Sequence, residues 1–115
     1  MDNQQLRVIA DAILDKKGED IISIDLRPLG TAITDHFVIC TGTSTTMVSA
    51  IADNIIKEAK EKLGIKPVRM QGMENAFWVI IDFGDAVVHI FLKEYREFYR
   101  LEDLWADAPR KTYTD

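Results

Sequence analysis

The chain has 115 residues, of which 47% are hydrophobic and 29% are charged, a balance typical of one globular domain. Its 19 acidic residues outnumber its 14 lysines and arginines, and the formal net charge is −5. Because nucleic-acid binding depends on clustered cations, this charge argues against a direct sequence-specific nucleic-acid partner and favours a basic protein surface.

The cysteine content and the first residues bear on the cellular compartment. Cys40 is the only cysteine, so no intrachain disulfide is possible, as expected in a reducing cytosol. Residues 1–5 lack the basic start and apolar run of a signal peptide, and no apolar segment approaches the ~20 residues that span a bilayer. We therefore expect a cytoplasmic protein without a membrane partner.

The first part of the chain predicts one helix and two strands. Asn3 is expected to cap a helix in which apolar residues recur at helical spacing and which ends at Gly18. A strand is expected over 21–26, a break over 27–30, and a second strand over 37–41. The nearly continuous apolar run in this second strand is typical of a buried strand.

The remainder predicts a long helix, three strands and a final helix. Gly42 and Ser44 precede the long helix, and Gly64 ends it. A short strand follows over 68–70, and a hairpin over 78–91 leads to the last helix. The resulting order, α-β-β-α-β-β-β-α, predicts a single layered α/β domain in which helices cover a mixed β-sheet.

The hairpin over 78–91 has two unlike faces when a two-residue turn joins its strands. One face is wholly apolar and is expected to pack against helices: Val79, Ile81, Phe83, Ala86, Val88 and Ile90. The other face pairs Trp78 with Phe91 and places Asp82 within hydrogen-bonding reach of His89. This second face is either a recognition surface or a surface that another helix covers.

Each enzymatic interpretation of the sequence requires further catalytic or ligand-binding residues that the sequence does not have. The join at 41–44 could cradle a phosphate at a helix N-terminus, but it lacks the Gly-Lys-Ser/Thr of a P-loop. It also resembles the opening of the nucleotidyltransferase fold, where two carboxylates one residue apart hold magnesium, whereas Asp82 and Asp85 lie three apart. Asp82 could orient His89 as a general base, yet no serine or cysteine is evident beside it. We therefore predict no catalytic set, no metal site and no cofactor.

Five stretches occur in a characteristic order and spacing. They are TDHFVICTGTS at 34–44, AIAD at 50–53, WVIIDFGD at 78–85, VHIF at 88–91 and REFYRLEDLW at 96–105. Together they resemble the ribosomal silencing factors, or Iojap family, over about residues 20–105 of what we expect to be one domain, 1–115. Two positions depart from the family pattern: Met47 stands where histidine is usual, and Gln71 stands where glutamate is usual.

The resemblance implies a translation repressor rather than an enzyme. Such factors bind the large ribosomal subunit through ribosomal protein L-fourteen, block joining of the small subunit and lower translation in nutrient limitation. The implied fold is a nucleotidyltransferase-like core that lacks the catalytic carboxylates. The alternative function is that of a nucleotide- or phosphate-binding enzyme with this fold.

The candidate partner-binding residues lie on the second face of the hairpin and on the segment that follows it. Aromatic side chains give a large contact area, and carboxylates meet the cations of a basic partner. The predicted contact residues are Trp78, Asp82, His89, Phe91, Glu94, Tyr95, Arg96, Glu97 and Tyr99. Leu101, Leu104 and Trp105 are expected to pack back on the sheet. We also expect a homodimer when the protein is free, because no helix is evident to cover the Trp78–Phe91 pair.

Overall fold

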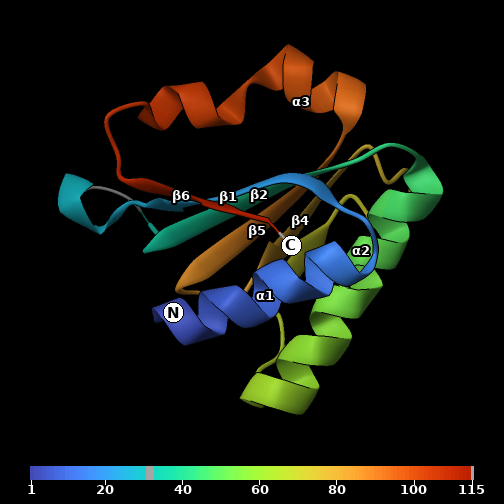
Figure 1. The fold of residues 1–115 in the computed structure, drawn as a ribbon, viewed down its shortest axis with the longest axis horizontal. Helices are drawn as coiled ribbons and strands as arrows, with labels where there is room; N and C mark the ends of the chain where they lie inside the picture. The colour runs from blue at the N-terminus through green and yellow to red at the C-terminus, as the bar shows by residue number, and fades with distance from the viewer. Residues whose placement is uncertain (31–32, 115) are drawn as a thin grey trace.

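The part of the chain that the computed structural model describes, residues 1–30 and 33–114, forms a six-stranded mixed sheet with helices on both faces (Figure 1). The strands are β1 (Glu19–Asp25), β2 (His36–Gly42), β3 (Arg69–Gln71), β4 (Trp78–Asp82), β5 (Ala86–Leu92) and β6 (Arg110–Tyr113). They lie in the order β3-β4-β5-β2-β1-β6. β2 and β5 run parallel, and the other neighbouring pairs run antiparallel. The predicted mixed α/β class is confirmed.

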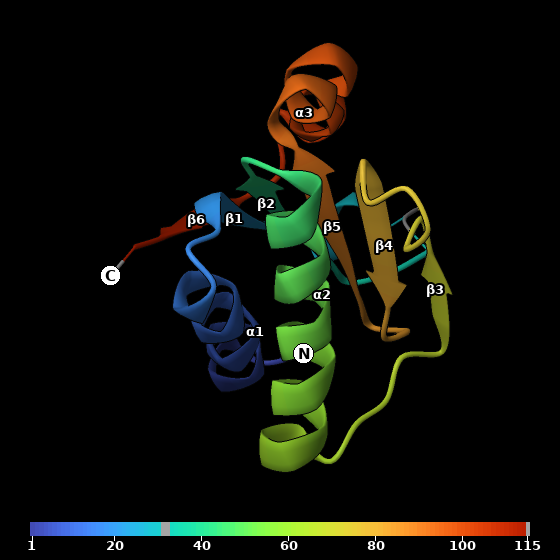
Figure 2. The ribbon, with the colours of Figure 1, turned by 90° about the vertical axis from the view of Figure 1, so that its right-hand side faces the viewer.

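The helices form two layers, one on each face of this sheet. α1 (Asn3–Asp15) and α2 (Thr45–Glu58) lie side by side on one face, and the π-helical turn η2 (Ala59–Leu63) extends α2. α3 (Lys93–Tyr99) and the 3-10 helix η3 (Leu101–Trp105) cross the other face, as Figures 1 and 2 show. A 3-10 turn, η1 (Arg27–Leu29), follows β1. None of the helices described here is both long and apolar enough to cross a membrane.

Side-chain caps fix the starts of the two long helices. Asp2, rather than the predicted Asn3, caps α1: its Oδ1 accepts from the Gln5 backbone at 2.9 Å, and the Gln5 side chain accepts from the Asp2 backbone at 2.9 Å. The reciprocal pair satisfies two helix-end donors, which Asn3 cannot do from the first helical position. Ser44 caps α2 as expected, accepting from the Met47 backbone at 3.1 Å.

The β4–β5 hairpin has the predicted register. Val79 lies opposite Ile90, Ile81 opposite Val88, and Trp78 opposite Phe91. The predicted apolar face is buried against α1 and α2: Val79, Ile81, Phe83, Ala86, Val88 and Ile90. A one-residue slip would have moved these side chains to the other face, so the burial confirms the register.

β6 is the strand that the sequence did not predict. It forms an edge of the sheet beside β1, where Ile21 pairs with Tyr113. Three of its four residues are exposed, so the strand lacks the apolar alternation on which a prediction depends. Tyr113 is its buried residue, and its hydroxyl lies 3.0 Å from Ser23 Oγ.

Candidate functional site

α3 and η3 cover the face of the sheet that carries Trp78 and Phe91 (Figure 1). The expectation of an uncovered aromatic pair is therefore wrong. The buried residues of this second core are Ile24, Leu26, Ile39, Phe91 and Ala108. Partly buried side chains pack around them: Ile22, Phe37, Trp78, Tyr95, Leu101 and Trp105. The chain can return over the sheet because Arg100, at the end of α3, takes a left-handed conformation (φ 48°) that separates α3 from η3.

Aromatic rings form a continuous series from this core to the surface. Trp78 stacks on Phe91 with ring centroids 4.7 Å apart, and Tyr99 contacts Trp78 at 5.0 Å. Phe98 meets Tyr99 edge-on at 5.1 Å. Exposure rises along the series, from 0% for Phe91 to 49% for Tyr99 and 79% for Phe98. The inner rings therefore support outer rings that remain accessible to a partner.

The outward side of α3 presents aromatic and acidic groups together. Glu94, Tyr95, Phe98 and Tyr99 line a shallow hollow of about 330 Å³. Phe77, from the loop before β4, stacks on Tyr95 with ring centroids 4.9 Å apart. We call these five residues the α3 surface. Aromatic groups beside a carboxylate are suited to binding a basic protein, because they combine contact area with charge complementarity.

His89 lies beneath this surface and is a packing residue. Its Nδ1 accepts a hydrogen bond from Trp78 Nε1 at 3.1 Å, and its ring meets Phe37 edge-on at 4.6 Å. Burial lowers the pKa of His89 to about 4, so the imidazole is neutral at neutral pH. Its Nε2 then carries the proton, and that buried atom has no hydrogen-bond partner among the described residues.

Asp82 does not bind His89, so the predicted pair is wrong. Asp82 Oδ1 accepts from the backbone N–H of Gly84 at 2.7 Å and closes the β4–β5 turn. In the register Asp82 lies opposite Val87, and His89 lies opposite Ile80. Diagonal neighbours in an antiparallel pair are roughly 7–8 Å apart, too far for the short aspartate side chain to reach the imidazole.

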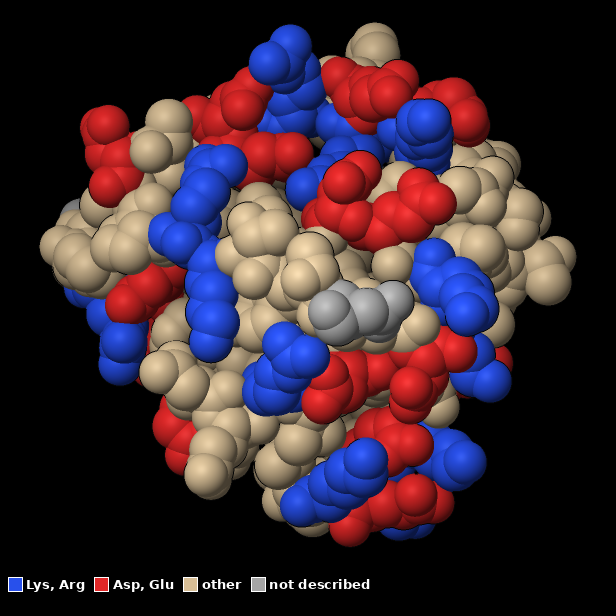
Figure 3. All heavy atoms as spheres, viewed as in Figure 1, with Lys and Arg blue, Asp and Glu red and all other residues tan. Residues whose placement is uncertain are grey.

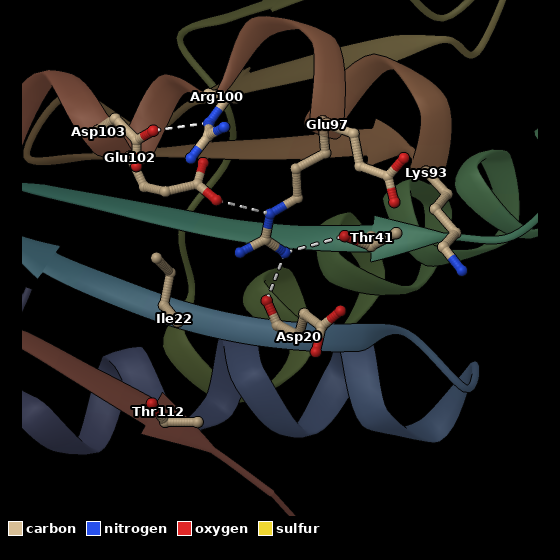
Figure 4. A pocket seen from close by; sticks show the side chains of 10 residues that line it. Asp20, Ile22, Thr41, Lys93, Glu97, Arg100, Glu102, Asp103 and Thr112 are labelled. Carbon is tan, nitrogen blue, oxygen red and sulfur yellow. Dashed lines mark hydrogen bonds and ion pairs between the residues drawn. The ribbon is translucent and has the colours of Figure 1, made fainter.

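Arg96 points from α3 towards the sheet rather than towards a partner. Its Nη1 donates to the carbonyl oxygen of Asp20 and, at 2.9 Å, to Thr41 Oγ1. Its Nε donates to Glu102 Oε1 at 3.1 Å, and Figure 4 shows these groups converging on the guanidinium. The Arg96 side chain is only 12% exposed. One arginine therefore joins α3 to β1, β2 and η3.

The pocket around Arg96 has a volume of about 530 Å³ and mixed charge. Lys93, Arg96 and Arg100 line it together with four carboxylates, those of Asp20, Glu97, Glu102 and Asp103. Arg100 Nε donates to Asp103 Oδ2 at 2.7 Å. Figure 3 shows side chains of both signs intermixed along the top of the molecule, over α3 and η3. Because the cations have carboxylate neighbours, we interpret this pocket as the junction that holds α3 to the sheet.

The structure separates the nine predicted contact residues by accessibility. On or beside the accessible side of α3 lie Glu94, Tyr95, Glu97 and Tyr99, with Trp78 half-buried beneath them. Three of the predicted residues make interior contacts instead: His89, Phe91 and Arg96. Asp82 lies apart, at the β4–β5 turn. Of the residues expected to pack on the sheet, Leu101 and Trp105 do so, whereas Leu104 is 71% exposed.

Two residues of the α3 surface are absent from the prediction. Phe98 follows Tyr95 by three positions, and this spacing on a helix is a signal that it shares the same side. Phe77 has no such signal, because its stacking on Tyr95 arises only when the chain turns back after β5.

The groups considered for catalysis are engaged or buried. Ser44 caps α2, and the Thr43 backbone N–H points to the Met47 sulfur at 3.4 Å. Burial raises the pKa of the Cys40 thiol to about 12, so it is not an available nucleophile at neutral pH. Across residues 1–30 and 33–114, no group of three or more His, Cys, Asp or Glu side chains is placed to hold a metal ion.

The comparisons with known proteins define the family. The chain belongs to the ribosomal silencing factors, since the family model described as "Ribosomal silencing factor during starvation" matches residues 1–115. It is 46% identical over 110 residues to the ribosomal silencing factor of Halalkalibacterium halodurans, with 95% of this chain and 92% of the relative covered. It is 44% identical over 104 residues to that of Bacillus subtilis, with 90% and 86% covered.

More distant relatives and solved structures agree with this assignment. A mouse protein named "Mitochondrial assembly of ribosomal large subunit protein 1" is 35% identical over 100 residues, which cover 85% of this chain and 43% of the relative. A crystal structure from Bacillus halodurans superposes with a TM-score of 0.82 at 40% identity, covering 96% of this chain and 98% of the other. One from Chromobacterium violaceum gives 0.85 at 33% identity, covering 100% and 95%. The relationship thus extends over the whole fold.

Proposed function

We propose that this protein represses translation by binding the large ribosomal subunit through ribosomal protein L-fourteen and blocking joining of the small subunit when nutrients are limiting. The observation that carries this proposal is the family match over residues 1–115. The names of the relatives support a ribosomal partner, and the mouse relative is named for the large subunit.

The α3 surface supports the proposal by offering a place for the contact. Tyr95, Phe98 and Tyr99 would act as aromatic anchors, because large rings on a short helix lose little side-chain entropy on binding. Glu94 on this surface, and the exposed Glu97 beside it, would meet lysines and arginines of the ribosomal protein. The buried predicted residues, His89, Phe91 and Arg96, would support this surface from below. Asp82 lies at the β4–β5 turn, so it would contact the partner only at the edge of the interface.

The proposed mechanism is steric exclusion. The domain measures 35 × 34 × 28 Å along its principal axes. An interface of ordinary size buries about 800 Å² on each partner, so a domain of these dimensions docked on the joining face would occupy space that the small subunit needs. Repression then needs no chemical reaction, in keeping with an inaccessible thiol and a neutral, buried imidazole.

We also propose that the free protein is a cytoplasmic homodimer. The reason differs from the one that the sequence suggested, because the Trp78–Phe91 pair is covered. The rings of Phe98 and Tyr99 remain exposed, and a second copy could bury them until a ribosome replaces it. Light scattering tests this: a monomer mass at tens of micromolar would contradict it.

For the fold, we propose a nucleotidyltransferase-like core without its catalytic carboxylates. The mixed sheet with helices on both faces supports this. Calorimetric titration with ATP, GTP and magnesium tests the alternative of a nucleotide-binding enzyme, for which we expect no heat of binding.

Co-sedimentation with isolated ribosomal subunits tests the function directly. We expect the protein to pellet with large subunits and to remain in the supernatant with small subunits. Large subunits that have been incubated with the protein should form fewer joined ribosomes when small subunits and magnesium are added. Equal binding to both subunits, or normal joining with the protein bound, would contradict the proposal.

A further inference from the structure

The β3 edge of the sheet has features that the α3 surface does not use. In the described part of the chain, β3 pairs with β4 and forms one edge of the sheet, as Figure 2 shows. All three of its residues are exposed, and Val68 just before it is 75% exposed. Backbone N–H and C=O groups on the free side of an edge strand are able to pair with a further strand.

A shallow apolar groove runs beside this edge. It has a volume of about 480 Å³ and lies between β3 and the end of α2. Its apolar lining includes Ile56 and Ile65 on one side and Val68 and Met70 on the other. Met70 lies opposite Ile81 in the register and so faces the α1–α2 side of the sheet. The groove is therefore on the opposite face of the sheet from α3.

The charge around this groove is opposite to that of the rest of the protein. Residues 57–69 contain five of the 14 lysines and arginines and two of the 19 acidic residues, so this segment carries +3 and the remainder carries −8. Lys60, Lys66 and Arg69 line the groove, and its described lining includes no acidic residue. These three cations have no ion pair among the described residues, whereas Lys62 pairs with Glu58 at 3.3 Å.

We propose that this groove binds an extended acidic segment of a partner protein, which adds a strand to β3. The backbone edge would supply the main-chain hydrogen bonds of strand addition, and alternate apolar side chains of the segment would enter the groove. Lys60, Lys66 and Arg69 would attract its carboxylates. This activity is separate from ribosome docking, because it uses the other face of the sheet.

The observations favour an acidic peptide over two other occupants. A single-stranded nucleic acid would use aromatic rings for base stacking, and no aromatic side chain is among the groove lining described here. A second copy of the chain would bring the same cations against one another. A segment with carboxylates and apolar residues complements both the charge and the shape of the groove.

NMR titration of the isotopically labelled full-length chain tests this inference. The probe is a short capped peptide of alternating glutamate and valine, compared with a lysine–valine peptide and a uridine oligonucleotide. We expect the acidic peptide to shift the backbone amide signals of residues 68–71 and to give cross-strand contacts with β3. The double variant Lys60→Glu/Lys66→Glu should weaken this binding by about tenfold. Val68→Asp should also weaken it, because the charge would enter the apolar groove.

The matched control is Lys16→Glu/Lys111→Glu, which changes the net charge equally at exposed positions away from β3. It should leave the dissociation constant of the acidic peptide unchanged, and both double variants should still pellet with large subunits. Four outcomes would overturn the inference: no shifts at β3, equal binding of the lysine–valine peptide, tighter binding of the oligonucleotide at the groove, or concentration-dependent shifts at β3 without any peptide.

Discussion

At the scale of single residues, His89 makes the stability of the second core depend on pH. Its imidazole accepts the Trp78 hydrogen bond in the neutral form. The folded-state pKa of His89 is about 4, below its ordinary value of 6.5, and burial is the cause. The folded state therefore favours the neutral imidazole. The contribution of neutral His89 to the free energy of unfolding is complete above pH 6.5, the pKa of the unfolded chain. It is lost as the pH falls towards 4, because the unfolded chain takes up a proton in this range before the folded chain does. The pKa of His36 is also lowered, mainly by burial, and acts in the same direction.

We predict that the free energy of unfolding falls by roughly 3 kcal/mol or more between neutral pH and pH 4. His89→Gln should be less stable at neutral pH but should lose less on acidification, because glutamine can accept the Trp78 hydrogen bond and does not titrate. Urea unfolding across the pH series measures both effects. If the variant and the parent have parallel pH profiles, His89 is not a main source of the acid sensitivity.

Phe98 provides a test of docking that does not disturb the fold. It is 79% exposed, so Phe98→Ala should leave the free energy of unfolding nearly unchanged and weaken large-subunit binding by roughly 2 kcal/mol, or about thirtyfold. The matched control is Val68→Ala, at a position that is 75% exposed beside β3, and it should bind as the parent does. Normal ribosome binding by folded Phe98→Ala would place the docking surface elsewhere.

At the scale of elements, we predict that Arg96 is a main contact holding α3 on the sheet. Arg96→Ala removes the hydrogen bonds to Asp20, Thr41 and Glu102 and leaves the largely buried Glu102 carboxylate without its cation. We expect a loss of about 3 kcal/mol, since removal of one partner of a buried ion pair leaves an uncompensated charge.

Hydrogen exchange at the α3 amides, together with urea unfolding, measures this loss. The control is Arg7→Ala, whose ion pair with Asp11 is about half exposed and should contribute no more than about 1 kcal/mol. Equal effects of the two substitutions would show that α3 is held by aromatic packing alone.

The elements differ in how well the sequence predicts them. The β4–β5 hairpin could be predicted to the residue, because alternation with period two and a short turn leave one register that buries Ile81 and Val88. β6 could not, because an exposed edge strand needs no apolar pattern. The packing of α3 over the sheet also could not be predicted. It depends on the reversal of the chain at Arg100 and on tertiary contacts such as that of Phe77 with Tyr95. For the site, sequence therefore identified the aromatic segment but not which rings are accessible.

At the scale of the whole molecule, a chain of net charge −5 is attracted to a basic partner, and we predict that the acidic groups on α3 direct the approach. Glu94→Lys and Glu97→Lys should each lower the association rate with large subunits by about five- to tenfold at low salt, and by less as salt screens the charges. The dissociation rate should change little, because exposed charges at a rim steer the encounter more than they hold the complex.

Surface-immobilised large subunits and a salt series give both rates. Asp53→Lys is the matched control, with the same charge change at an exposed position on α2. If Asp53→Lys slows association as much as the α3 variants do, only the total charge matters and α3 has no special role in the approach.

The parallel pairing of β2 with β5 has a consequence for when the α3 surface can form. His36 pairs with Ala86, 50 residues later, so the centre of the sheet cannot close while the chain is still short. α3 follows β5 directly and rests on that closed centre. A nascent chain that has not yet reached β5 therefore lacks the closed sheet on which α3 rests. The surface that we propose for docking should therefore form only late in synthesis of the chain, after β5 has paired with β2.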